Sequence, residues 1–148
     1  MSDLTDEKDF VRLYAQVWNT LDTSPLREYL DAGVRYLLQE TEARLEGREA
    51  VMSYRSRKVE AVKESDLPVY AEMGCCGSQE GPIRVTGAPE GRPCVVLAQP
   101  TPEDVVAMAL LDIKAESIQR IVLCTTTPDP ATAKRTGTYP GRKTGATD

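Results

Sequence analysis

The chain has 148 residues, the size of one domain, and 28% of them are charged. Its net charge of −5 leaves no excess of basic groups to release counterions, so nucleic acid and membranes are excluded as main partners. It contains no histidine, which excludes a histidine base, a Ser-His-Asp triad and a His-ligated metal. With no signal peptide and no apolar run near the roughly 18 residues of a spanning helix, we expect a cytoplasmic protein without cofactor or metal.

Residues 2–22 predict an amphipathic first helix, because apolar residues recur there at helical spacing. Two residues are candidates for the N-cap of this helix. Ser2 has acidic residues behind it, and Thr5 has Lys8 where a capping box requires Glu or Gln. The apolar residues that share one face are Phe10, Tyr14, Val17, Trp18 and Leu21.

A short second helix is predicted next, with Ser24 as its N-cap, Pro25 at its first position and Gly33 as its left-handed stop. Residues 34–40 then alternate in hydrophobicity as a strand does. Residues 41–47 allow a brief second strand that ends in a turn. The first part of the chain is therefore expected to run helix, short helix and strand pair.

Residues 48–65 predict a long helix, since they are rich in Ala, Glu, Lys and Arg and contain no Gly or Pro. Its basic residues have two interpretations. They recognise an anionic ligand at a pocket mouth, or they form the solvated face of the helix, paired with glutamates. We favour the solvated face. The basic residues are Arg48, Arg55, Arg57, Lys58 and Lys63, and the apolar positions are Val51, Met52, Tyr54, Val59 and Val62.

Four strand-like segments fill the second half of the chain, separated by a Gly- and Pro-rich loop and by two short turns. They cover residues 69–76, 92–99, 103–113 and 117–125. The segment 128–148 lacks an apolar pattern and is interpreted as a flexible C-terminal tail. We therefore expect a single domain over residues 1–127, followed by that tail.

Helices that precede a run of antiparallel strands indicate an α+β fold rather than a parallel α/β sheet. The order and several phrases resemble the nuclear transport factor 2-like superfamily, which includes polyketide-cyclase-like and ketosteroid-isomerase-like proteins. The resemblance spans about residues 6–125, and LEGREAVMSY is its most specific part. The phrases that carry it are FVRLYAQVWNTLD, LREYLDAGVRYLLQ, LEGREAVMSYRSR and SIQRIVLC.

This resemblance implies a cone-shaped, cystatin-like α+β barrel in which a curved antiparallel sheet wraps a long helix. It also implies an apolar pocket between sheet and helices, and a homodimer formed through the outer face of the sheet. We expect a small apolar molecule as the ligand of this pocket. The residues expected to line it are Tyr14, Trp18, Tyr36, Leu38, Tyr54 and Met108; the alternative is that the aromatic ones only fill the core.

The catalytic residues of the superfamily's steroid isomerases are matched only in part. Tyr14 lies where their donor tyrosine lies, but their base position falls near Leu38 and their second donor near Ala109. An apolar side chain cannot take a proton, so acid–base chemistry would need another carboxylate. Asp112 is our first choice as base, with Tyr14 as donor; the remaining candidates are Asp31, Glu40 and Glu72.

The stretch MGCCG, residues 73–77, raises the question of a metal or redox site. Adjacent strand residues point to opposite faces, so if the strand continues through Cys75 and Cys76, these two thiols cannot chelate one ion together. Cys94 could face either of them across a hairpin, and Cys124 could approach from the side. The alternatives are a thiol cluster, or small buried thiols at strand ends with glycines that mark a bulge or the end of pairing. We favour the buried thiols.

Three functions follow as hypotheses. The first is a small-molecule-binding protein with an apolar pocket, whose catalytic form would be a lyase or isomerase of small apolar compounds. The second is a non-catalytic dimeric module for protein interaction. The third is a thiol-based redox or soft-metal sensor that uses Cys75, Cys76 and Cys94. A cavity above roughly 300 Å³ with convergent polar groups would count against the interaction module.

Overall fold

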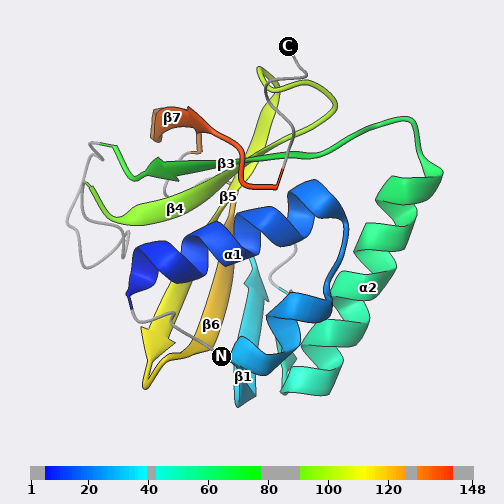
Figure 1. Ribbon diagram of the computed structural model, residues 1–148, viewed down its shortest axis with the longest axis vertical. Coiled ribbons are helices and arrows are strands. Elements are labelled where there is room, and N and C mark those ends of the chain that lie inside the picture. The colour runs from blue at the N-terminus through cyan, green and yellow to red at the C-terminus, as the bar shows by residue number, and fades with distance from the viewer. Residues whose placement is uncertain (1–5, 40–42, 78–90, 126–129, 142–148) are drawn as a thin grey trace.

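The computed structural model describes residues 6–39, 43–77, 91–125 and 130–141, which form a curved sheet with two α-helices packed on it (Figure 1). Two short 3₁₀ helices, written η, complete the elements. In chain order they are α1 (Glu7–Thr20), η1 (Ser24–Tyr29), β1 (Leu30–Leu38), β2 (Ala43–Glu46), α2 (Arg48–Glu64), β3 (Tyr70–Cys75), β4 (Pro93–Ala98), β5 (Val105–Lys114), β6 (Ser117–Cys124), η2 (Pro130–Thr132) and β7 (Lys134–Thr138).

The strands lie in the order β2-β1-β6-β5-β4-β3-β7. Every neighbouring pair is antiparallel except β1 and β6, which run parallel with Tyr36 opposite Ile121. The predicted α+β class is confirmed. The sheet is mixed rather than wholly antiparallel, because the last long strand, β6, returns beside the first one. It ends at β2 and β7 and does not close into the barrel that the resemblance implied.

Both helices cover the same face of the sheet, which we call the inner face. α1 packs on β3, β4 and β5, whereas α2 packs on β1 and β2. Figure 1 shows α1 crossing in front of the sheet and α2 standing beside β1. The main core lies between these layers and includes Phe10 and Tyr14 from α1, Tyr36 from β1, and Leu111 from β5. The long helix therefore shares the covering of the sheet with α1.

α1 begins at a capping residue that differs from both predicted starts. The Asp6 carboxylate accepts a hydrogen bond from the backbone N–H of Asp9 at 2.9 Å, which satisfies one free donor of the first turn. The predicted starts, Ser2 and Thr5, lie outside the described residues. The apolar face is as predicted for its central residues, and the buried set is Phe10, Val11, Tyr14, Ala15, Val17 and Trp18.

The second helix is shorter than predicted and is the 3₁₀ helix η1. The backbone becomes extended at Leu30, and Gly33 lies inside β1 without a left-handed conformation. The predicted helix stop at Gly33 is therefore wrong. Leu30 and Val34 are both buried on the core side, so β1 is already needed there to cover the core. The Asp31 carboxylate accepts a hydrogen bond from the Gly33 N–H at 2.9 Å within this strand.

The segment interpreted as a flexible tail contains η2 and β7, and β7 pairs antiparallel with β3. The buried carboxylate of Glu72 anchors it. Arg135 Nε donates to Glu72 at 2.6 Å, and the backbone N–H of Gly137 donates to its other oxygen at 2.6 Å. The tail interpretation is wrong for these residues, because a polar strand held by its backbone and by one buried acid has no apolar pattern. Residues 128–129 and 142–148 of that tail lie outside the described part.

The two glycines of the MGCCG stretch allow the C-terminal segment that contains η2 and β7 to pass close to the end of β3. A Cβ atom at Gly74 would lie 2.8 Å from the carbonyl oxygen of Lys134. At Gly77 a Cβ atom would lie only 2.0 Å from the carbonyl oxygen of Thr132, which no side chain tolerates without movement. The two glycines therefore mark the close approach of the C-terminal segment to the end of β3.

Candidate ligand pocket

A pocket of about 580 Å³ opens between α2 and the inner face of the sheet. Its walls come from α1, α2, β1, β4, β5 and β6, and from the chain just after α2. Leu67 and Val106 line it and are each 50% exposed, so its opening has an apolar rim. Small-molecule sites commonly enclose about 300–1,000 Å³, and this pocket lies within that range.

Three aromatic side chains line the pocket: Trp18 from α1, Tyr36 from β1 and Tyr54 from α2. The rings of Tyr36 and Tyr54 pack with their centres 5.3 Å apart and their planes tilted by 54°. Burial raises the pKa of Tyr36 well above its usual value, and the neighbouring phenol of Tyr14 adds to this shift. The Tyr36 hydroxyl therefore stays protonated at neutral pH and can act as a hydrogen-bond donor.

Arg55 of α2 is the unusual residue of this pocket. Its side chain is 0% exposed, and none of its three guanidinium nitrogens has a hydrogen-bond partner among the described residues. The guanidinium carbon lies 4.1 Å from the ring centre of Trp18 and 4.9 Å from that of Tyr14. Cation–π contacts contribute about 2 kcal/mol when desolvated, so these rings offset part of the cost of burying the cation.

The described residues that line the pocket include no aspartate or glutamate. The other acids considered as bases lie elsewhere. Glu72 is engaged by Arg135 of β7, and Asp31 accepts the N–H of Gly33. Glu40 lies outside the described residues. A proton-abstracting carboxylate in this pocket therefore has no candidate among the residues that the structure describes.

The structure brings together four of the residues expected to line a pocket, namely Trp18, Tyr36, Leu38 and Tyr54. Tyr14 is fully buried in the adjoining core, beside Arg55, and its hydroxyl has no hydrogen-bond partner. Tyr14 therefore does not line the pocket as expected, whereas the other four do. Ligand binding by them stays a prediction.

Met108 is not placed in this pocket. It lies on the outer face of the sheet, in a second buried cluster with Cys94 and Cys124. Alternation along β5 turns Ala107 and Ala109 toward the helices, and Met108 therefore points the opposite way. The sequence pattern of β5 does not reveal this, because apolar residues occupy both faces of the strand.

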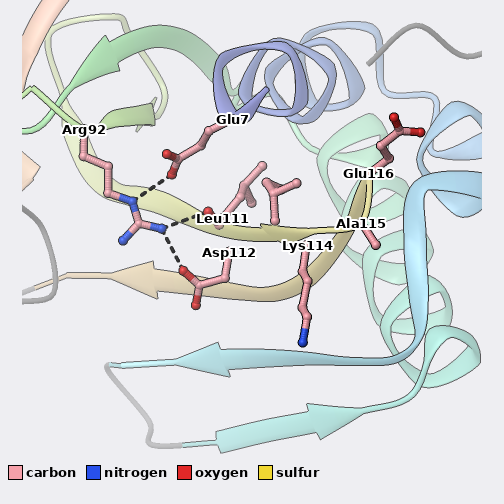
Figure 2. Close-up of a pocket in the computed structure, with 8 residues that line it drawn as sticks. Glu7, Arg92, Leu111, Asp112, Lys114, Ala115 and Glu116 are labelled. Atoms are coloured by element: carbon pink, nitrogen blue, oxygen red, sulfur yellow. Dashed lines mark hydrogen bonds and ion pairs between the residues drawn. The ribbon is translucent and has the colours of Figure 1, made fainter. Parts of the chain in front are cut away.

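Asp112 lies in a different pocket, of about 410 Å³, together with Glu7 and Arg92 (Figure 2). Its carboxylate oxygens accept hydrogen bonds from Arg92 Nη2 at 2.8 Å and from Arg120 Nε at 2.6 Å. Arg92 Nε also donates to Glu7 at 2.8 Å, as Figure 2 shows. Asp112 is thus part of a partly exposed ion-pair network and does not line the pocket that holds Arg55.

The four cysteines are free thiols, and Cys76, Cys94 and Cys124 are buried on the outer face of the sheet. A hydrogen bond with Cys94 lowers the pKa of Cys76, whereas the same contact, with burial, raises the pKa of Cys94. Burial also raises the pKa of Cys124, to about 11. No group of three metal-ligating side chains comes together among the described residues. This arrangement agrees with the interpretation as small buried thiols.

The interpretation of Arg55 as a solvated helix residue is wrong. Arg55 lies on the buried face of α2 with Val51 and Val59, because residues four apart share one side of a helix. The signal in the sequence was this spacing, which places a basic residue in line with two apolar ones. Arg57 and Lys58 are exposed, as predicted.

No known protein-family profile matches the chain, and no curated protein does. Solved structures do. A nuclear transport factor 2-like protein of unknown function from Mesorhizobium loti matches with a TM-score of 0.55 at 12% identity, over 90% of this chain and 97% of that one. A second such protein, from Cytophaga hutchinsonii, matches with a TM-score of 0.53 at 13% identity, over 83% of this chain and 92% of that one. A SnoaL-like protein of unknown function from Burkholderia thailandensis matches with a TM-score of 0.51 at 12% identity, over 86% of this chain and 95% of that one.

The chain therefore has the nuclear transport factor 2-like fold, and the resemblance seen in its sequence is confirmed at the level of the fold. Sequence identities of 12–13% show only that the fold is shared. They do not show a shared activity, because this fold hosts unrelated activities. Within the part of the chain that is described, neither α-helix has the length and apolar character needed to cross a bilayer. The chemistry must be argued from the pocket.

Proposed function

We propose that the protein binds a small, largely apolar molecule in the pocket between α2 and the sheet. The observation that carries this proposal is the pocket itself, with a volume of about 580 Å³, an apolar rim and an aromatic wall. Most of the described residues that line it are apolar; the polar ones are Arg55, Lys58, Ser65 and Gln99. A concave apolar site with a few polar groups is the usual form of a small-molecule site.

A lyase or isomerase would be the catalytic form of this function. Its support is weaker, because such chemistry needs a base and the described lining residues include no carboxylate. Asp112 and Tyr14, the pair expected from the sequence, are not brought into one pocket. We therefore propose binding as the function and leave the catalytic form without assigned residues.

The alternative is a non-catalytic interaction module. A filled core would favour it, and a pocket of about 580 Å³ counts against it. Association of two copies through the outer face of the sheet stays a prediction. η2 packs on β5, and Ala133 packs against the outer-face cluster, so a partner would have to contact the sheet elsewhere.

Trp18 provides the test, because it is the only tryptophan of the chain and lines the pocket. We expect the neutral apolar dye N-phenyl-1-naphthylamine to bind saturably at one site and to receive excitation energy from Trp18. Val106→Glu places a charge on the apolar rim and should weaken binding roughly fivefold or more. Ser53→Glu adds the same charge at an exposed position of α2 outside the pocket and should change nothing. Equal binding by both variants would contradict the proposal.

A further inference from the structure

The buried cation of Arg55 has no anionic partner within the described chain. Its side chain is fully buried, and within the described ranges it forms no salt bridge and its Nε and both Nη atoms have no acceptor. An arginine differs here from a buried lysine, which can lose its proton and become neutral. A guanidinium in a protein is a cation, so its charge must be compensated.

The neighbouring aromatic rings compensate it only in part. Trp18 and Tyr14 stand one turn apart on α1, and the guanidinium lies over both ring faces. A ring face attracts the cation but accepts no strong hydrogen bond from its five N–H groups. Water can accept such bonds, but it does not neutralise the charge. The position therefore favours an anion over water.

The pocket provides a volume next to Arg55 in which such an anion can bind. Arg55 and Trp18 both line it, and the described lining residues contain no acid that could pair with the guanidinium. Lys58 also lines the pocket but is exposed, and its Nζ lies 5.6 Å from the ring centre of Tyr54. Arg55 is therefore the deeper and drier of the two cations. An anion bound to it would gain the stronger electrostatic interaction.

The geometry selects among anions. A guanidinium offers its N–H groups in its own plane, where a planar carboxylate accepts two parallel hydrogen bonds. One buried cation balances one negative charge, whereas a phosphate dianion would need further donors. Tyr36 lines the same pocket, and burial keeps its hydroxyl protonated, so it adds no negative charge that would oppose the anion. The remaining walls are apolar.

We infer that the ligand of this pocket is a monocarboxylate with an apolar body, whose carboxylate binds Arg55 and whose body lies against Tyr36, Tyr54 and the apolar rim. This inference rests on the proposed function, because it names the class of molecule that the same pocket takes. Arg55 is the residue that sets the specificity for the anion, and the aromatic and aliphatic walls hold the apolar part.

The test compares two ligands of equal shape, 2-naphthoate and its neutral amide 2-naphthamide, by isothermal titration calorimetry at pH 7. We expect 2-naphthoate to bind at least tenfold more tightly, since charge-assisted bidentate hydrogen bonds contribute this much. Arg55→Met should abolish the preference and leave the affinity for 2-naphthamide within about threefold. Arg57→Met, the same substitution at an exposed position two residues away, should keep the preference.

Each outcome bears on one claim. Equal affinity of the wild-type protein for both ligands would overturn the carboxylate inference and leave the proposed function standing. A preference that survives Arg55→Met and disappears in Lys58→Met would also overturn it, because the anion would then bind at the pocket mouth. Failure of the protein to bind 2-naphthoate, 2-naphthamide and N-phenyl-1-naphthylamine alike would overturn the proposed function itself. The comparison in the wild-type protein requires no variant to fold.

Discussion

The guanidinium carbon of Arg55 on α2 lies 4.1 Å from the ring centre of Trp18 on α1, and the guanidinium nitrogens form no hydrogen bond with any described residue. This contact links α1 and α2 at the wall of the pocket and leaves the pocket open. It places a permanent positive charge in the driest part of the pocket. Stability and binding should therefore respond to this residue in opposite directions.

Arg55→Met should make the protein without ligand more stable. A charge left uncompensated inside a protein costs about 3–5 kcal/mol, so replacing Arg55 with an unbranched apolar side chain should remove a cost of this order. The lost cation–π contacts, about 2 kcal/mol for a desolvated cation, reduce this gain. Urea unfolding followed by far-UV circular dichroism measures the difference in unfolding free energy.

Arg57→Met is the matched control for this stability measurement. Its side chain is exposed on the same helix, so its unfolding free energy should stay within about 0.5 kcal/mol of the wild type. A loss of more than about 1 kcal/mol in Arg55→Met would show that the guanidinium is compensated inside the folded chain.

Gly77→Ala should loosen the C-terminal segment. The added Cβ would lie 2.0 Å from the Thr132 carbonyl oxygen, so η2 and β7 must shift, at a cost of about 1–3 kcal/mol. Trypsin should then cleave after Lys134 and Arg135 faster than in the wild type, as mass spectrometry would detect. At Gly33 the nearest atom to a new Cβ is a flexible Asp31 oxygen at 3.5 Å, so Gly33→Ala should show the wild-type cleavage rate.

The turn between β5 and β6 should accept a stabilising double substitution. Ala115 and Glu116 connect the paired residues Lys114 and Ser117, with φ angles of 53° and 62°. Two positive φ values define a turn that favours Asn-Gly, and left-handed backbone costs other residues about 1–2 kcal/mol each. Ala115→Asn with Glu116→Gly should therefore raise the melting temperature.

Glu103→Gly is the control for that turn. Glu103 is exposed and does not have a positive φ, so glycine there only adds freedom to the unfolded chain. We expect it to lose about 0.5–1 kcal/mol. A double turn variant that is no more stable than the wild type would contradict the turn assignment.

Stability should fall in alkaline solution, in part because of Cys124. Burial raises the pKa of this thiol to about 11, above the value near 9 that it has in the unfolded chain. From pH 9 upward the unfolded state therefore releases a proton that the folded state retains, and folding loses roughly 2–3 kcal/mol by pH 11. Urea unfolding in a reducing buffer should show a smaller alkaline loss for Cys124→Ala. Below pH 8 both proteins should show the same pH dependence.

The sequence predicted most of the fold because its elements carry periodic apolar residues. The first helix was found from the spacing of its apolar residues, the third from its composition, and the four later strands from apolar segments between turn signals. β7 was missed because its residues are polar and exposed, and it is held by pairing with β3 and by Glu72. Such long-range contacts leave no local pattern in the chain.

The pocket was predicted in part, from the resemblance to the nuclear transport factor 2-like superfamily. Tyr36 and Tyr54 were identified because that resemblance implied a pocket between the sheet and the helices, within reach of both side chains. Met108 was placed on the wrong face, since strand alternation fixes which residues share a face but not which face is inward. Arg55 was interpreted as solvated because a charged helix composition outweighed its position between Val51 and Val59.

The most direct test of this account is a crystal structure of the protein grown with 2-naphthoate. We predict that the naphthalene ring lies against Tyr36 and Tyr54, and that both carboxylate oxygens lie about 2.7–2.9 Å from nitrogens of Arg55. A carboxylate at the pocket mouth beside Lys58, with Arg55 still lacking an acceptor, would contradict the account. So would a structure in which Arg55 has moved out of the pocket into solvent.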